Sequence, residues 1–358
     1  MNLGGCLTDV AGVKVGHAHR VGGGWCTGTT VVLLPPETTA GVDVRGGGPG
    51  TRETDLLHPL ATMPYANAIC LTGGSAYGLA AAGGVMAHLE AKGVGFPVGA
   101  GAGEVVPIVP GAVIFDLGRG GRFANRPDES FGRRAAAAAR ARPCANGSVG
   151  AGTGARSKGL QGGVGTASVA LPDGTIVAAL AVVNSAGTVV DPDTGLPWVE
   201  GGTRLRRPPA SERAALRAHF AAASPSLGSP AQGNPALNTT IGVVATTAAL
   251  TKAQAGKLAS VAHDGMARAI RPVHSLLDGD VVFGVATGRD TAPQPADPAH
   301  AARVRMMWLN SVLEAGAQAF AAACTNAVVS ATGRGGAPAY RDLCPSAFTR
   351  FPITSPKR

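Results

Sequence analysis

The residues best suited to chemistry in this sequence are Asn238 and Thr239, which stand where a polar segment meets an apolar run. Residues 223–237 are rich in Pro, Ser and Gly, a composition that favours a linker over a packed core. Ile241 and Val243 then begin the β-branched, apolar run that is typical of a buried strand. A threonine at this junction has two possible roles. It is either a turn residue at the start of the strand or a nucleophile that attacks the carbonyl carbon of Asn238.

The second role is autoproteolysis, in which the Thr239 hydroxyl forms an ester with Asn238 and water then releases a new chain that starts at Thr239. The freed α-amine would have a pKa of about 7.7–8, which suits a general base acting on the hydroxyl of the same residue. Spacing alone leaves both roles open, so the surrounding elements must be considered.

The composition argues against several functional classes. With 358 residues, 45% of them hydrophobic, the chain can bury one large core or two medium ones. The six cysteines are scattered without a C-x-x-C pair, so we expect no zinc site, no redox dithiol and no cofactor. The net charge of +9 comes mainly from arginines in stretches with almost no aromatic residues, which favours solvated faces over a nucleic-acid surface.

Membrane insertion and secretion are not expected either. No run approaches the ~18 apolar residues that span a bilayer. The first residues lack the basic and apolar regions of a secretory signal. We therefore expect a soluble, cytoplasmic protein.

The apolar patterns predict alternating strands and helices. A Pro-Asp-Gly turn between two apolar runs indicates a β-hairpin, and such pairs favour a mixed sheet with layered helices over a purely parallel one. The predicted strands cover residues 29–34, 40–44, 68–71, 105–115, 164–171, 176–183, 239–249 and 281–286, and the predicted helices cover 75–90, 131–142, 210–222, 252–270 and 298–323.

Two glycine-rich segments do not match a known catalytic loop. The run that begins at Arg45-Gly-Gly-Gly is not a phosphate-binding P-loop. Ser75 lies between a strand and a helix, but Tyr77 replaces the second glycine of a nucleophile elbow, so we interpret Ser75 as a helix N-cap.

Six segments, in this order along the chain, resemble the DmpA-type family. This family contains the β-peptidyl aminopeptidases, the L-aminopeptidase/D-amidase-esterases and the nylon-oligomer hydrolases. The resemblance extends from about Leu7 to Ser330. It rests on the Arg45-Gly-Gly loop, Ala68-Ile-Cys-Leu-Thr-Gly-Gly-Ser-Ala-Tyr-Gly-Leu79, Val113-Ile-Phe-Asp116, Val182-Val-Asn-Ser185, Asn238-Thr-Thr-Ile-Gly-Val-Val-Ala-Thr246 and Asp278-Gly-Asp280.

The resemblance implies a single αββα sandwich over residues 1–358, similar to the N-terminal-nucleophile hydrolases. The chain would cleave itself between Asn238 and Thr239 into an α-chain of residues 1–238 and a β-chain of residues 239–358. A threonine at this position is similar to the nylon-oligomer hydrolase branch rather than to the serine-dependent aminopeptidases. The resemblance also implies an oligomer of processed protomers.

Carried across residue by residue, the resemblance implies four further site residues. Lys158 matches an active-site lysine, Asn184 an asparagine beside the nucleophile, and Asp278 and Asp280 a carboxylate pair that holds the threonine. Phe115 departs from the pattern, because an aromatic hydroxyl is expected there.

The chemistry of these side chains is compatible with the implied roles. The Asn184 amide can donate to an oxyanion, a contact typically worth ~3 kcal/mol in a dry site. Lys158 can stabilise negative charge or move a proton, and Asp278 and Asp280 can accept hydrogen bonds from Thr239. Each residue also has a plain alternative: a turn after a strand for Asn184, an exposed loop for Lys158, and an ordinary Asp-Gly-Asp turn.

We therefore predict an autoprocessed hydrolase of short amides, peptides or amino-acid esters with Thr239 as its nucleophile. One alternative is an acyl transferase similar to ornithine acetyltransferases, which would pass the acyl group to an amine in preference to water. The other is an unprocessed binding protein of the same fold.

Overall fold

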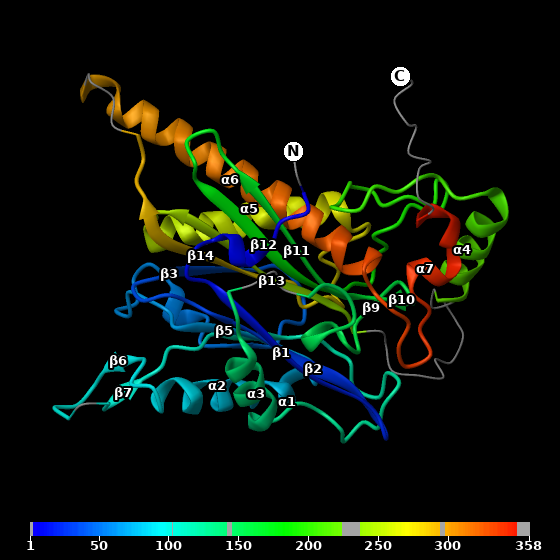
Figure 1. The fold of residues 1–358 in the computed structure, drawn as a ribbon, viewed down its shortest axis with the longest axis horizontal. Helices are drawn as coiled ribbons and strands as arrows, with labels where there is room; N and C mark the ends of the chain where they lie inside the picture. The colour runs from blue at the N-terminus through cyan, green and yellow to red at the C-terminus, as the bar shows by residue number, and fades with distance from the viewer. Residues whose placement is uncertain (1–2, 102, 142–144, 224–236, 294–297, 349–358) are drawn as a thin grey trace, which may run out of the picture.

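The computed structural model describes residues 3–101, 103–141, 145–223, 237–293 and 298–348. Most of the predicted linker, residues 224–236, and Cys144 lie outside the described residues. The elements form four layers, with helices above and below two stacked sheets (Figure 1). The predicted αββα sandwich is thus confirmed.

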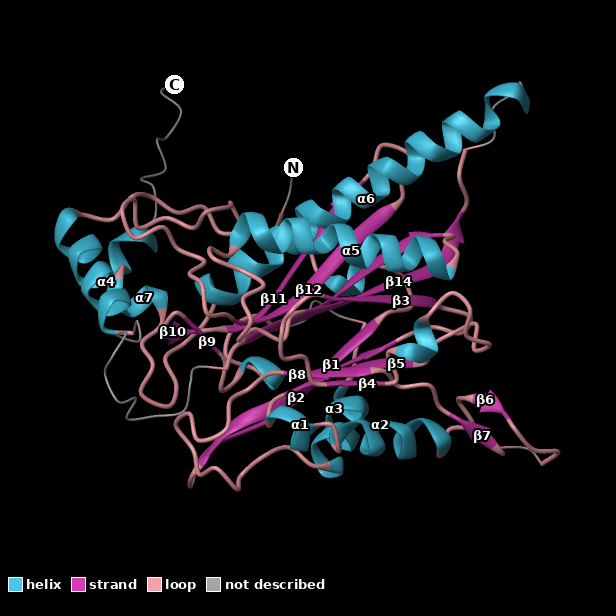
Figure 2. Cartoon of the chain, turned by 180° about the vertical axis from the view of Figure 1, so that it is seen from behind, coloured by secondary structure: helices cyan, strands magenta, loops and turns pink. Residues whose placement is uncertain are grey.

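The upper sheet carries the junction identified from the sequence. Its strands are ordered β11 (Gly163–Ala170), β12 (Ile176–Asn184), β13 (Thr239–Ala248), β14 (Val281–Asp290) and β3 (Thr39–Val44). All neighbours are antiparallel except β13 and β14, which are parallel. Helices α5 (Lys252–Ala269) and α6 (Pro298–Val329) cover its outer face, as Figure 2 shows from behind. The segment that begins at Thr239 therefore forms the central strand.

The lower sheet is ordered β1 (Lys14–Gly22), β2 (Trp25–Leu33), β5 (Ala68–Thr72), β8 (Gly111–Val113) and β4 (Thr51–Arg52). Helices α2 (Ala81–Glu90) and α3 (Glu129–Ala138) cover its outer face (Figure 1). The smaller elements are α1 (Ser75–Gly78), α4 (Ala210–Ala222), α7 (Tyr340–Leu343), the pair β6 (Phe96–Pro97) and β7 (Val105–Val106), the pair β9 (Arg156–Ser157) and β10 (Leu160–Gln161), and the 3-10 turns Leu7–Asp9, Asp55–Leu57, Gly150–Gly152 and Pro345–Phe348.

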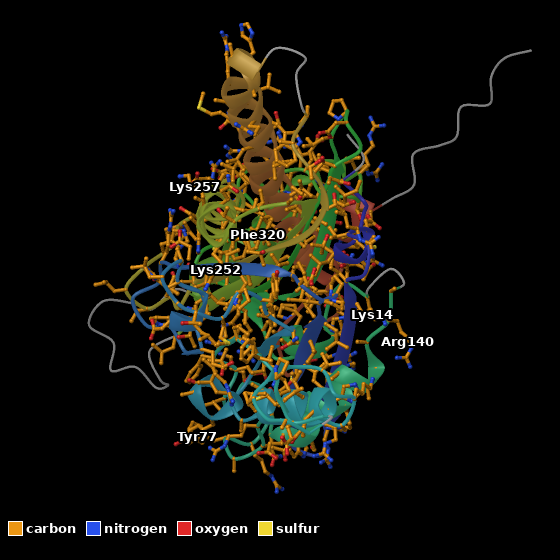
Figure 3. The ribbon with its side chains drawn as sticks, turned by 90° about the vertical axis from the view of Figure 1, so that its left-hand side faces the viewer. Lys14, Tyr77, Arg140, Lys252, Lys257 and Phe320 are labelled. Carbon is orange, nitrogen blue, oxygen red and sulfur yellow. The ribbon has the colours of Figure 1, made fainter. Side chains whose placement is uncertain are left out.

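Period-two alternation explains how one strand serves two cores. Ile241 and Val243 of β13 point between the two sheets, whereas Val244 points toward α5 and α6. Gly242 also faces the helices, and a Cβ atom there would lie 2.7 Å from the Phe320 ring, so a larger residue would force this close packing apart. Figure 3 shows Phe320 among the elements of the upper layers.

By length and composition, helix α6 could cross a membrane, but 83% of its apolar 18-residue stretch is buried inside the protein. This burial is typical of a core helix, because α6 packs against α5 and against β11 and β12.

Two of the predicted elements were wrong. The strand predicted over residues 105–115 is only β7 and β8, because Pro107 and Pro110 interrupt it and cannot donate to a sheet. The helix predicted over 75–90 divides into α1 and α2, and its N-cap is Gly74 rather than Ser75, which has a positive φ of 52°.

Candidate active site

The candidate site lies at one end of the upper sheet, where several strands begin or end. Thr239 is the first residue of β13 and pairs directly with Asn184, the last residue of β12. Strand β14 begins immediately after Asp280, and Asn238 forms a parallel bridge with Asp278. The sheet register thus brings together three segments that are far apart in the sequence.

The peptide bond between Asn238 and Thr239 is held in a defined environment. The Thr239 hydroxyl donates to the Asn238 carbonyl oxygen. The Gly279 amide donates to the same oxygen at 3.0 Å, and the Asn238 amide donates to the Leu277 carbonyl at 3.1 Å. Thr239 is only 5% exposed. The hydroxyl and its own preceding carbonyl are therefore adjacent, and a backbone N–H polarises that carbonyl.

Asp280 connects the start of β13 to a histidine. One carboxylate oxygen accepts from the Thr240 amide at 2.6 Å, and the other lies 2.8 Å from His274 Nδ1. The carboxylate therefore fixes the backbone of the residue that follows Thr239.

Asp278 is buried and has one oxygen free. Its Oδ2 accepts from the Ser275 hydroxyl at 2.6 Å and from the Ser275 amide at 2.9 Å. Its Oδ1 has no partner of normal hydrogen-bond geometry within the described ranges, although the Ala186 amide is near enough to lower the pKa of this carboxyl. Burial, with the nearby charge of Asp280, raises that pKa above its usual value.

The glycine run after Arg45 supports the turn that carries both carboxylates. The Arg45 amide donates to the Asp280 carbonyl at 2.9 Å, and the Gly48 amide donates to the Asp278 carbonyl at 2.9 Å. A Cβ atom on Gly46 would lie 2.3 Å from the Asp278 carbonyl oxygen, which leaves room only for glycine. This run thus packs on the turn of residues 278–280 and helps to hold its backbone in place.

Both the oxygen and the nitrogen of the Asn184 side-chain amide form hydrogen bonds. Its oxygen accepts from Arg119 Nη1 at 2.7 Å and from the Arg156 amide at 3.0 Å. Its nitrogen donates to the Phe115 carbonyl at 3.3 Å. Because one N–H is used in this way, only the second N–H remains for an oxyanion.

Lys158 lies close to the site through its backbone. It is in the tight turn between β9 and β10 with a positive φ of 47°, and its amide donates to the Ser185 carbonyl at 3.1 Å. The described part of the chain gives its side chain no hydrogen bond to Thr239. The structure thus gathers Asn184, Asp278 and Asp280 around the Asn238–Thr239 bond, with Lys158 just beyond the end of β12.

Sequence reasoning missed Arg119, His274 and the Gly279 amide. Arg119 Nη2 donates to the Leu237 carbonyl at 2.8 Å, and its guanidinium lies 5.5 Å from the centre of the Phe115 ring. Its position after the short strand β8 gave no sequence signal. The sequence did offer a signal for His274, because this histidine stands four residues before Asp278 and so belongs to the same turn as the Asp-Gly-Asp motif.

His263, a buried histidine that packs against the turn of residues 274–280, is expected to make the stability of the fold sensitive to acid. The His263 ring lies 4.9 Å from that of His274, and burial lowers the pKa of His263 to about 4. The unfolded chain therefore binds a proton near pH 6.5 that the fold accepts only near pH 4, so acidification favours unfolding in this window. We expect Tm to fall by about 5 °C or more between pH 7 and pH 4.5, measured by circular dichroism.

The matched comparison uses His263→Gln, which should reduce this pH dependence, and His58→Gln at an exposed position, which should not. The buried His17, whose pKa is also lowered to about 4, contributes with the same sign in both variants. Both comparisons keep Asp116, whose pKa is raised to about 6 by burial and which acts with the opposite sign. If Tm falls equally steeply with pH in wild type and in His263→Gln, His263 is not a source of the acid sensitivity.

The profile of Peptidase family S58 matches residues 5–339. The chain belongs to this family. A relative in Mycobacterium tuberculosis, named as an uncharacterized aminopeptidase, is 50% identical over 352 residues, which cover 96% of this chain and 98% of the relative. The 6-aminohexanoate-oligomer endohydrolase of a Kocuria species is 31% identical, over 80% of this chain and 76% of the relative.

Solved structures extend the agreement on the fold. A β-aminopeptidase from a Burkholderia species has a TM-score of 0.65 at 22% identity and covers 96% of this chain and 93% of its own. The L-aminopeptidase D-Ala-esterase/amidase of Ochrobactrum anthropi, described as a variant of the Ntn hydrolase fold, has a TM-score of 0.65 at 20% identity and covers 96% of this chain and 90% of its own. The predicted family and its fold are thereby confirmed. As a family S58 member, the protein is a hydrolase of the peptide-bond class.

Proposed function

We propose that this protein cleaves its own chain between Asn238 and Thr239 and then hydrolyses small amides or peptides with Thr239 as its N-terminal nucleophile. The single observation that carries the proposal is the scissile carbonyl itself. Its oxygen accepts hydrogen bonds from both the Thr239 hydroxyl and the Gly279 amide. A hydroxyl adjacent to a polarised carbonyl is the arrangement that an N-to-O acyl shift requires.

The self-cleavage proceeds in two steps. Thr239 Oγ1 bonds to the Asn238 carbonyl carbon, the Gly279 N–H stabilises the oxyanion, and the carbon–nitrogen bond then breaks as the Thr239 nitrogen takes a proton. Water next hydrolyses the ester, leaving a carboxylate on Asn238 and a free α-amine on Thr239. Oδ1 of Asp278, which has no hydrogen-bond partner of normal geometry among the described residues, is available to accept from the hydroxyl or the new ammonium.

The same groups serve substrate hydrolysis. The freed α-amine takes the proton of the Thr239 hydroxyl as Oγ1 bonds to the substrate carbonyl carbon, the carbon–nitrogen bond of the substrate breaks as its amine leaves with that proton, and water then hydrolyses the ester on Oγ1. Asp280 keeps the nucleophile in place by holding the Thr240 amide. Asn184 pairs with Thr239 across β12 and β13, and this pairing supports a role for its second N–H in stabilising the oxyanion, while Lys158 is proposed to assist proton transfer. The relatives' printed names, aminopeptidase and oligomer endohydrolase, support this class of substrate.

The proposal is tested by the intact mass of freshly purified protein, followed over days of incubation. We expect the 35.4 kDa chain to divide into two fragments, and the N-terminal sequence of the smaller fragment to begin at Thr239. A chain that stays whole, or one that is cut at another bond, overturns the proposal. A cytoplasmic location and an oligomer of processed protomers remain proposals that fractionation and size-exclusion chromatography address.

A further inference from the structure

Arg119 contacts both residues that precede the scissile bond. Its Nη2 donates to the Leu237 carbonyl at 2.8 Å and lies 3.5 Å from Asn238 Oδ1. Its Nη1 donates to Asn184 Oδ1 at 2.7 Å. One guanidinium therefore joins the segment before the bond to the residue that pairs with Thr239 across the sheet.

These contacts complete the support of Asn238. The turn of residues 277–279 holds the peptide groups of Asn238 itself, because the Asn238 amide donates to the Leu277 carbonyl at 3.1 Å and the Asn238 carbonyl accepts from the Gly279 amide at 3.0 Å. Among the described residues, only Arg119 donates to the preceding carbonyl, that of Leu237. The attack by a neighbouring hydroxyl depends on the orientation of the carbonyl, so Asn238 must be held on both sides of its Cα atom.

The arginine is itself held in place by its loop. Its backbone amide donates to the Asp116 carbonyl at 3.1 Å, and its guanidinium lies 5.5 Å from the centre of the Phe115 ring. A Cβ atom on the next residue, Gly120, would overlap Gly335 Cα, so the loop packs closely on the backbone of that glycine. The guanidinium is thus presented from a backbone that has little room to move.

The charge of Arg119 suits a bond to a neutral carbonyl. Burial and the nearby Arg156 lower the pKa of Arg119 to about 10, while the Asp116 carboxylate acts in the opposite direction. The guanidinium therefore stays protonated at neutral pH. A charged donor forms a stronger hydrogen bond to a carbonyl oxygen than a neutral one does, so this contact needs no anionic ligand.

The other contact of Arg119 is duplicated. Asn184 Oδ1 also accepts from the backbone amide of Arg156 at 3.0 Å, and this donor is retained whatever side chain stands at position 119. Asn184 therefore keeps a donor that fixes its orientation without Arg119, whereas the Leu237 carbonyl does not keep one. Loss of Arg119 should accordingly affect the uncut chain more than the divided enzyme.

We propose that Arg119 is a positioning residue for self-cleavage, which holds Leu237 and Asn238 so that the scissile carbonyl carbon stays within reach of Thr239 Oγ1. This inference rests on the proposed function and gives self-cleavage a requirement that the hydrolysis of a small amide does not share. Arg119 keeps its proton throughout, and no bond to it forms or breaks.

The test is Arg119→Ala, followed by intact mass over days. We expect division to slow by about 100-fold, the effect of a displacement of about 1 Å. The fraction that has divided should hydrolyse L-alanine p-nitroanilide within about tenfold of the wild-type rate, because it lacks one ordinary hydrogen bond. Arg122→Ala is the matched control, since this arginine is exposed in the same loop, and both of its rates should equal those of wild type.

A second readout separates positioning from a structural role. Guanidinium chloride at about 20 mM, far below denaturing concentrations, should speed the division of Arg119→Ala and leave that of wild type unchanged. Sodium chloride at the same concentration should have no effect. If Arg119→Ala does not fold, Arg119→Lys takes its place: one ammonium nitrogen does not span the Leu237 carbonyl and Asn184 Oδ1 together, so division should be slower than in wild type at an unchanged Tm.

The outcomes distinguish this inference from the proposed function. If wild type divides and Arg119→Ala divides as fast, or if division and hydrolysis slow by the same factor, the inference is wrong and the hydrolase stands. A slow Arg119→Ala that guanidinium does not speed, or an Arg119→Lys that divides at the wild-type rate, overturns the inference in the same way. A wild-type chain that never divides overturns the proposed function as well.

Discussion

Replacing Thr239 with alanine is expected to leave one undivided chain of 35.4 kDa with no amide hydrolysis. The variant lacks the oxygen that attacks the Asn238 carbonyl, and without scission it also lacks the α-amine that would act as base. Both losses fall on one residue, so we expect hydrolysis of a small anilide to drop by on the order of 10⁴-fold or more. Intact mass spectrometry and a rate assay on the same preparation measure the two effects.

The control for Thr239→Ala is the adjacent Thr240→Ala. Thr240 is equally buried, and its hydroxyl has no hydrogen-bond partner in the described structure, whereas its backbone amide, which binds Asp280, is retained in the variant. This second variant should divide normally. Division of Thr239→Ala at the wild-type rate would show that another residue breaks the chain.

The second large effect is expected for Gly279→Ala. A Cβ atom there would lie 2.6 Å from the Gly48 carbonyl oxygen and 2.9 Å from Thr239 Oγ1. The Gly48 oxygen belongs to the backbone and cannot turn away, so the turn must shift and carry its N–H away from the Asn238 carbonyl. A displacement of about 1 Å can slow a positioned reaction by about 100-fold. We expect self-cleavage to slow by at least this factor, as measured by a mass time course.

Gly256→Ala is the matched control, because a Cβ atom at this position in α5 has nothing within 4 Å. Alanine in a helix interior stabilises by roughly 0.5–1 kcal/mol relative to glycine, so this variant should be at least as stable and should divide normally. If Gly279→Ala folds with the wild-type Tm and divides at the wild-type rate, the Gly279 amide is not needed to polarise the Asn238 carbonyl.

Local sequence patterns predicted the elements that have strong local signals. The hairpin of β11 and β12 followed from two apolar runs around a Pro-Asp-Gly turn, and α5 followed from apolar residues at helical spacing. Short elements such as β8 carry too few residues for any periodicity, so the prediction over 105–115 merged them. The patterns also favoured layered helices on a mixed sheet, but the αββα arrangement of two stacked sheets depends on long-range pairing, and only the resemblance to a family supplied it.

The site was less predictable than the fold, because its parts meet through sheet register. Nothing in the spacing of Asn184 and Thr239 indicates that they face each other across two strands. The Asp-Gly-Asp turn was visible as a motif, but its contact with the glycine run after Arg45 was not. Arg119 was missed because a solitary arginine in a glycine-rich loop resembles many exposed ones.

The position of β13 has a consequence for how a divided protein would unfold. Residues 239–358 supply β13 and β14, which lie between β12 and β3 of residues 1–238, so each fragment lacks the neighbours that its strands need. An uncut chain folds as one molecule, whereas a cut one must find its second fragment by diffusion, and refolding then depends on concentration. Denaturation of the mature protein would thus be a dissociation, and its working lifetime would be set by the rate of unfolding.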